Sequence, residues 1–242
     1  MPHKNNLLLA SLSPGDMVAL QPHLKLVHLE QDHVLFEAGD TIEATYFPTS
    51  AVISIVVILS SGQVVEAAMV GRDGIIGASA ALDGKMALSR AVIQLSGEAM
   101  VCSLEGLRGA AMQSQSLLSL LIRHEQTLYA QAQQSTACIA AHHVEARLCR
   151  WLLRSRDLSQ SDTLLFTQEF LAEMLGVNRT SVTVVAHTLQ RAGIIQYSRG
   201  KIRITNLEGL QDAACECYEA VRSQYHGLLG WHSAQAKIRA PS

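Results

Sequence analysis

The stretch from Gln168 to Gln190, QEFLAEMLGVNRTSVTVVAHTLQ, constrains the fold more than any other part of the chain. Two short helices that cross steeply around a tight turn need a small residue at their contact, and Ala172 meets that need. Gly176 supplies the positive φ of the turn, and Asn178 is a good N-cap for the second helix. The predicted apolar interior consists of Leu171, Leu175, Val177, Val182, Val185 and Leu189. The pattern predicts a helix-turn-helix, with an ordinary helical hairpin as the alternative.

The outward face of the second helix is polar and carries no acidic side chain. Side chains near the N-terminus of such a helix reach base edges in the major groove, and Arg is the best fit to guanine. The candidate base-contacting residues are Arg179, Thr180, Ser181 and Thr183. The methyl groups of Thr180 and Thr183 are suited to contact thymine.

A second set of residues is placed to hold DNA phosphates. Thr167 and Gln168 open the first helix, where backbone N–H groups also face a phosphate. Two short strands, Ile194–Ser198 and Lys201–Ile204, follow the second helix around a basic tip, as expected of a wing on the DNA backbone. The candidate phosphate-contacting residues are Thr167, Gln168, His187, Arg199 and Lys201. Double-stranded DNA is therefore the predicted partner.

Residues 25–103 have a different pattern, in which short runs rich in Val, Ile and Leu alternate with Gly-containing turns. The predicted strands are Lys25–Leu29, His33–Phe36, Ala51–Leu59, Val64–Val70, Arg90–Leu95 and Glu98–Leu104. Regular short strands with Gly turns indicate an all-β sandwich or barrel, here a jelly-roll-like β-roll. The predicted fold class is thus α+β, with an N-terminal β-roll, a long helix and a C-terminal winged helix-turn-helix domain.

A long helix is predicted over residues 105–141, which contain no Pro. Its predicted seam for pairing with a second copy is marked by Leu117, Leu121, Leu128 and Cys138. The alternative is a helix that lies on the sheet of its own domain. A hinge is expected at residues 140–143, followed by a helix from His143 to Arg156, and the segment from Leu207 to Gly227 also has a helical pattern.

With these motifs in place, the sequence resembles the Crp/Fnr family of bacterial transcription regulators over nearly the whole chain. The resemblance rests on the β-roll, on the long helix leading into VEARLCRWLL, and on TQEFLAEMLGVNRTSVTVVAHTLQRAGII with its wing. It implies a homodimer on a palindromic DNA site, RNA polymerase as a further partner, and an N-terminal effector domain shaped like a cyclic-nucleotide-binding domain. The expected domains are residues 1–112 (effector), 113–143 (dimerisation helix and hinge) and 144–242 (DNA binding).

The sequence departs from the family pattern at the residues that would hold a cyclic nucleotide. Nucleotide-binding members carry Gly-Glu-Leu and then Arg-Ser/Thr-Ala about ten residues on, whereas this chain has Gly77-Ala78-Ser79 and Ser89-Arg90-Ala91. The helix positions facing a purine are Ala132 and Gln133 rather than hydroxyl residues. The expected effector pocket comprises Gly77, Ala78, Ser89, Arg90 and Gln133. The effector is unknown and is not expected to be cyclic AMP; the alternative function is that of a small-molecule-binding regulatory protein.

The recognition helix also departs from the family, because Thr180 and Val184 stand where members often have Glu and a second Arg. The preferred half-site should therefore differ from theirs. The formal net charge of −2 divides into −5 over residues 1–144 and +3 over residues 145–242. An acidic front and a basic rear indicate two modules with different partners.

No cofactor, metal or enzymatic activity is predicted. Residues 1–101 lack Cys, which argues against the iron–sulfur members of the family. Cys215 and Cys217 would point apart on a continuous helix, so they are not expected to share a metal with the His142-His143 pair, and Cys138 is the thiol singled out for redox sensing. His28 and His33 lack the spacing of a β-roll metal enzyme. Without a signal peptide or membrane-spanning run, the expected location is the cytoplasm.

Overall fold

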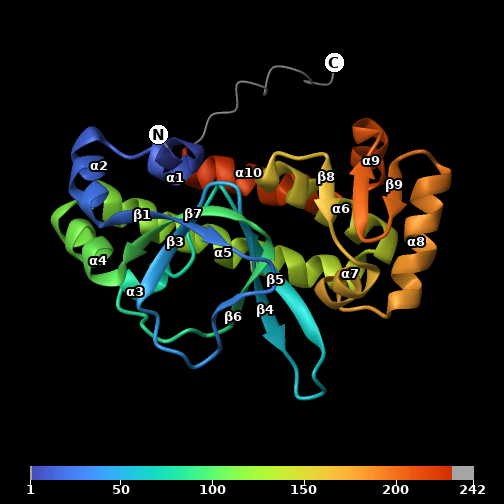
Figure 1. Cartoon of the computed structure of the whole chain (residues 1–242), viewed down its shortest axis with the longest axis horizontal. Helices are drawn as coiled ribbons and strands as arrows, with labels where there is room; N and C mark the ends of the chain where they lie inside the picture. Colours follow the sequence, from blue (N-terminus) through green and yellow to red (C-terminus); the bar gives the residue numbers. More distant parts are fainter. Residues whose placement is uncertain (1, 231–242) are drawn as a thin grey trace.

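The computed structural model describes residues 2–230, so the last twelve residues of the expected domain 144–242 lie outside the described part. The described chain is α+β, with antiparallel sheets in its N-terminal half and a helical C-terminal half. Helix α5 (Gln115–Ala141) runs through the middle, between the helices α2 (Pro14–Leu20) and α4 (Leu104–Gln113) at one end and α8 (Arg179–Arg191) at the other (Figure 1). The predicted fold class is confirmed.

Two antiparallel sheets form the N-terminal half. One has the order β1-β7-β3, with strands Leu24–Leu29, Gly97–Ser103 and Ala44–Pro48. The other has the order β2-β6-β4-β5, with strands Val34–Phe36, Arg90–Leu95, Val52–Ile58 and Val64–Val70. Buried side chains from both sheets, among them Ile53, Ile93 and Ala99, pack into one cluster. The apolar, β-branched strands thus bury one face each between the sheets.

Short helices close the ends of this half: η1 (Pro2–Asn5), α1 (Leu7–Ala10), η2 (Gln21–His23) and α3 (Ala78–Ala81), together with α2 and α4. The side chain of Ser13 caps α2 by accepting a hydrogen bond from the N–H of Asp16, and Pro14 occupies the first turn. The strand β3 was not expected, because its sequence ATYFP lacks the Val and Ile runs of the others.

The predicted helix over 105–141 is two helices, α4 and α5, because Ser114 is extended between them and caps α5. The seam expected to face a second copy faces the chain itself: Leu117, Leu121 and Cys138 are at most 2% exposed. Leu128 also packs against the cluster between the sheets. The assignment of Leu117, Leu121 and Cys138 to a dimer contact is therefore corrected, since a side chain buried within one chain has no surface left for a partner, whereas the half-buried Leu128 stays a prediction.

The C-terminal half follows a two-residue break at His142 and His143. It contains α6 (Val144–Ser159), α7 (Gln168–Leu175) and α8, with a three-stranded sheet of order β8-β10-β9 made of Thr163–Leu165, Lys201–Ile204 and Ile195–Ser198. The predicted single helix over 207–227 is divided into α9 (Leu207–Ala213) and α10 (Cys217–Leu229). Ala214 has extended backbone (φ −79°, ψ 151°), which ends α9.

The two halves share one hydrophobic core. Trp151 of α6 packs edge-on against Phe166, which precedes α7, and Phe170 of α7, and the same cluster takes in Val56 and Met69 of the N-terminal sheet. The last described helix, α10, leaves the C-terminal half and lies along α5 (Figure 1). Among the described residues, no helix combines the length and the apolar character that a membrane span requires.

Candidate nucleic-acid interface

Helices α7 and α8 meet around a turn that is fixed at each step by a local interaction. The side chain of Thr167 caps α7 by accepting from the N–H of Phe170 at 3.1 Å. Gly176 ends α7 with a positive φ of 62°, and Asn178 caps α8 by accepting from the N–H of Ser181 at 2.8 Å. A left-handed residue followed by an N-cap makes the sharp change of direction between two helices.

The interior between these helices is as the sequence predicts. Leu171, Leu175, Val182 and Leu189 are buried, Ala172 is nearly so, and Val177 and Val185 pack against them. Arg147 of α6 donates through Nη2 to the carbonyl of Leu175, so α6 holds the C-terminal end of α7 directly. The outward face of α8 is therefore presented by a rigid support.

The four expected base-contacting residues differ in how free they are. Arg179 and Thr180 are exposed at the start of α8, and the Arg179 side chain is 65% exposed. Ser181 donates its hydroxyl to Asn178 Oδ1 at 2.9 Å. Thr183 donates to Gln168 Oε1 at 2.7 Å, and that bond ties the recognition helix to the start of α7. Arg179 and Thr180 are thus the two whose side chains are exposed, whereas Thr183 is bonded to Gln168.

A cavity of about 460 Å³ opens where the starts of α7 and α8 meet the wing. It is lined by Thr167, Gln168, Glu169, Arg179, Tyr197, Arg199 and Gly200. Four of these were predicted as DNA-contacting residues, and the structure brings them to one concave surface. His187 and Lys201 are exposed outside its lining.

Glu169 and Tyr197 were missed by the sequence analysis. Glu169 forms an exposed ion pair with Arg179 (Oε2–Nη1 3.4 Å), a kind of contact that contributes little stability and exchanges readily for another anion. The acidic residue lies ten positions before Arg179 on another helix, so no helical spacing reveals the pair. The wing turn carries positive φ at Arg199 (48°) and Gly200 (75°), the geometry of a tight hairpin turn, and directs the arginine outward.

A second cavity, of about 590 Å³, lies between the four-stranded sheet β2-β6-β4-β5, the loop 83–89 and α5. Its lining is mostly apolar, with Phe36, Ile55, Leu88, Leu128 and Tyr129 among the lining residues. Of the expected effector residues, Gly77 and Ser89 line it, whereas Ala78 is fully buried and Gln133 is exposed elsewhere.

Arg90 does not point a free guanidinium into this cavity. It forms a bidentate ion pair with Glu37, with N–O distances of 2.8 and 2.7 Å. The pairing raises the pKa of Arg90 and neutralises the charge that would attract a phosphate. The apolar residues of α5 in the lining, Leu128, Tyr129 and Ala132, could be found from sequence only with knowledge of which face of α5 meets the sheet.

Comparison with known proteins assigns the C-terminal half. Residues 146–213 match the Crp-like helix-turn-helix domain. This range contains α6, the helix-turn-helix, the wing and α9, which are the elements described above. A comparison with curated proteins finds no match.

Solved structures match over most of the chain. FixK2 from Bradyrhizobium japonicum is 15% identical, with a TM-score of 0.68 over 79% of this chain and 98% of that one. The CRP-family regulator TTHB099 from Thermus thermophilus is 21% identical, with a TM-score of 0.65 over 78% and 96%. The c-di-GMP-responsive regulator CLP from Xanthomonas campestris is 17% identical, with a TM-score of 0.61 over 79% and 99%.

At these identities the structural likeness concerns the fold, and the helix-turn-helix match supplies the functional class. Both agree with the geometry of α7, α8 and the wing. Residues 146–213 are therefore a Crp-like helix-turn-helix domain, and the chain has the fold of the CRP/FNR-family regulators that it resembles.

Proposed function

We propose that the chain binds a palindromic double-stranded DNA site sequence-specifically as a homodimer, with Arg179 and Thr180 reading bases from α8. The observation that carries this proposal is the concave surface where Arg179 of α8 meets Gln168 of α7 and Arg199 of the wing. An exposed arginine at the start of a helix that fits the major groove is suited to bidentate contact with guanine O6 and N7. Ser181 and Thr183 complete the proposed base-contacting set.

The proposed phosphate contacts surround this surface. Thr167, Gln168, Arg199 and Lys201 lie at the start of α7 and on the wing, and His187 is exposed further along α8. On approach to DNA, Arg179 exchanges Glu169 for a base edge, while phosphates bind the wing and the start of α7. Contacts of this kind fix the register of a protein on the duplex and make affinity fall with salt.

We propose that dimerisation uses the exposed face of α5 rather than the buried one. Along that face, Ile122, Tyr129 and Ile139 are 45%, 68% and 43% exposed. With Ala132 and Thr136 they follow a heptad spacing, and we call these five residues the α5 seam. Large apolar side chains in a heptad row are typical of a helix that pairs with its own copy.

We propose that residues 1–112 sense a small molecule, 113–143 pair the protomers and 144–242 bind DNA, with RNA polymerase as a further partner. The apolar cavity beside α5 supports a sensor, because Tyr129 and Ala132 belong both to its lining and to the α5 seam. A ligand there would contact the dimer helix directly. Since Arg90 is paired with Glu37 and no Glu follows Gly77, the ligand class is an apolar molecule rather than cyclic AMP.

The test compares Arg179→Ala with Lys201→Ala by fluorescence anisotropy on operator and random DNA. Loss of the guanine contact should cost about 1–3 kcal/mol on the operator and reduce discrimination at one base pair. Lys201→Ala should weaken binding to both DNAs alike. Arg222, on the exposed side of α10 and away from the interface, provides the control Arg222→Ala. An Arg179→Ala variant with full discrimination would contradict the assignment.

A further inference from the structure

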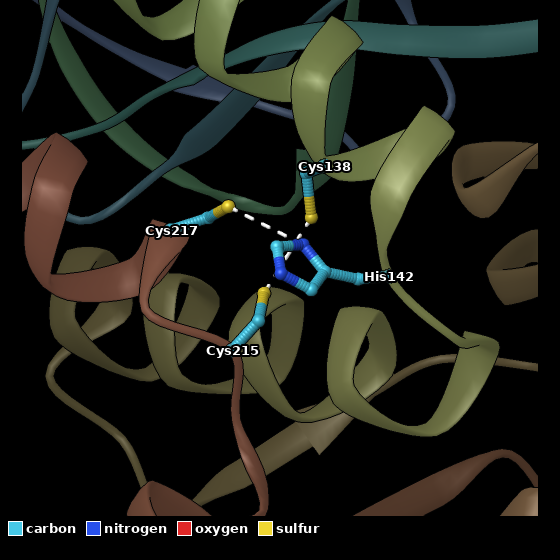
Figure 2. Close-up of side chains that lie close together, drawn as sticks. All are labelled: Cys138, His142, Cys215 and Cys217. Carbon is cyan, nitrogen blue, oxygen red and sulfur yellow. Dashed lines mark hydrogen bonds between the residues drawn. The ribbon is translucent and has the colours of Figure 1, made fainter.

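Four metal-ligating side chains from three segments meet beside the break between α5 and α6. Cys138 lies in the last turn of α5, and His142 is the residue that ends it. Cys215 lies in the connection between α9 and α10, and Cys217 begins α10. Figure 2 shows the four side chains converging on one point, and their ligand atoms all lie within 4.8 Å of one another.

The sequence analysis expected the side chains of Cys215 and Cys217 to point apart, and the structure shows that this expectation is wrong. The expectation assumed a continuous helix, in which residues two apart point in different directions. Because the chain is extended at Ala214 and α10 begins only at Cys217, both thiols turn to the same side. The pair Cys-x-Cys then joins Cys-x₃-His from α5 in one donor set.

The distances fit a single tetrahedral ion. The Sγ atoms of Cys138 and Cys215 are 3.5 Å apart, and Cys217 Sγ lies 3.6 Å from His142 Nδ1. A zinc ion at about 2.3 Å from each thiolate places tetrahedral ligands about 3.8 Å apart. One ion at the centre therefore needs little movement of these two pairs, and the widest pairs, up to 4.8 Å apart, must close by about 1 Å.

The groups around the donors match the surroundings of a zinc site. The other ring nitrogen of His142, Nε2, lies 3.2 Å from the Glu216 carboxylate, so that Nδ1 is directed at the thiols. Gln134 donates through Nε2 to Cys217 Sγ at 3.1 Å, a bond that favours a thiolate. A carboxylate behind a ligating histidine and a hydrogen bond to a ligating sulfur are the usual outer contacts of such sites.

The burial of these thiols is not explained by hydrophobic packing. Cys138, Cys215 and Cys217 form a buried cluster of their own, and within residues 2–230 Ala146 is the one partly buried hydrophobic residue packed against it. Cys102 and Cys149, by contrast, lie within the large apolar cores. These three buried sulfurs and the imidazole have few apolar neighbours. A shared metal ion would therefore stabilise them more than their contacts with one another do.

We propose that Cys138, His142, Cys215 and Cys217 bind one Zn²⁺ ion, which joins the end of α5 to the start of α10. Binding releases the thiol protons and leaves three thiolates and one neutral imidazole on the ion. The site fixes the break at residues 142–143, from which α6 leads to the helix-turn-helix through the Arg147–Leu175 bond. It is a structural site, because all four positions are filled by side chains.

The test measures metal in the full chain, purified with reductant from zinc-replete medium, by elemental mass spectrometry. The wild type should hold about one zinc ion per chain, and Cys138→Ser/Cys215→Ser should lose at least about nine-tenths of it. His142→Ala should hold zinc more weakly against a chelator. The matched control is Cys102→Ser, at a buried thiol in β7 whose pKa burial raises to about 11. Zinc at wild-type level in the double variant would overturn the proposal.

A measurement on the wild type avoids dependence on how the variants fold. Zinc is removed at low pH in the presence of reductant, and Co²⁺ is titrated into the refolded chain. The proposal predicts saturation at one Co²⁺ per chain with the strong visible bands and sulfur-to-metal charge transfer of a tetrahedral thiolate site. Octahedral cobalt spectra, iron–sulfur absorption in the purified chain, or a Cys138–Cys215 disulfide in place of bound metal would each contradict it. No DNA enters either measurement, so the result is independent of the proposed DNA binding.

Discussion

Glu66 is a buried carboxyl at the point where the N-terminal sheet meets α6. It accepts hydrogen bonds from Ser54 Oγ at 2.6 Å and from Trp151 Nε1 at 3.0 Å. Burial raises its pKa from 4.5 to about 7, although these bonds and the nearby Arg150 and Arg154 act in the opposite direction. Burial therefore raises the pKa of Glu66 by more than the hydrogen bonds and the two arginines lower it.

Because the pKa of Glu66 is raised in the folded chain, we expect the stability of the fold to depend on pH. Between pH 4.5 and about 7 the folded chain keeps a proton that the unfolded chain has lost, so the free energy of unfolding falls as pH rises. The total loss should approach about 3 kcal/mol and be complete above pH 7. Urea unfolding from pH 5 to 8 should show it in the wild type and not in Glu66→Gln. Glu98→Gln, on the exposed side of β7, is the matched control. Equal slopes in wild type and Glu66→Gln would contradict the account.

At the scale of elements, Gly176 fixes the turn between α7 and α8 in two ways. Its φ is positive, and a Cβ there would lie 3.1 Å from Val65 Cγ2 of β5. Gly193 also has a positive φ but has open space around it. In Gly176→Ala, the strained positive φ should lower the free energy of unfolding by about 1–2 kcal/mol, and the close contact with Val65 should lower it further. In Gly193→Ala, only the loss caused by the positive φ is expected. Val65→Ala should remove the difference between the two in urea unfolding; an unchanged difference would show that the contact is irrelevant.

We expect two copies of the chain to pair through the exposed face of α5. Tyr129→Glu places a charge in the α5 seam and should shift the chain from dimer to monomer in sedimentation equilibrium. Met112→Glu is the control, since Met112 is a 60% exposed apolar residue on α4 outside the seam. A Tyr129→Glu dimer as stable as the wild type would place the interface elsewhere.

Sequence patterns predicted the elements whose signals are local. The helix-turn-helix follows from Gly176 and Asn178, and the strands follow from runs such as AVISIVVIL. The sequence did not reveal which face of α5 is exposed, because the most apolar face, with Leu117 and Leu121, packs into the chain's own core. The Cys and His cluster could not be predicted either, since a single extended residue, Ala214, turns Cys215 toward Cys138 of α5, 77 residues earlier.

At the scale of the whole molecule, the sensor-like and DNA-binding halves are joined at three places. The shared core lies around Trp151, the Arg154–Asp73 ion pair has an N–O distance of 2.6 Å and is largely buried, and α10 lies along α5. Tyr225 of α10 stacks under the Arg154 guanidinium and accepts from Gln131 of α5. Helix α5 is therefore connected to α10, and α10 to α6, by packed side chains.

The charge distribution predicts how DNA affinity responds to salt. With a balance of only +3 over residues 145–242, binding depends on a few placed cations such as Arg199 and Lys201. The logarithm of the affinity should fall linearly with that of salt concentration, with a slope of about −0.9 per phosphate contacted. Arg199→Ala should make the slope shallower by about one contact per protomer, measured by anisotropy titrations at several salt concentrations. An unchanged slope would remove Arg199 from the interface.

We expect α8 and the wing to bind DNA sequence-specifically in a dimer of this chain. Selection of bound sequences from a pool of random double-stranded DNA, carried out with the purified full chain, tests it most directly. The account predicts an enriched palindrome whose half-sites lie about one helical turn apart, with a guanine in each half-site that loses its enrichment in Arg179→Ala. A pool that stays random, or an enriched site without two-fold symmetry, would contradict the claim.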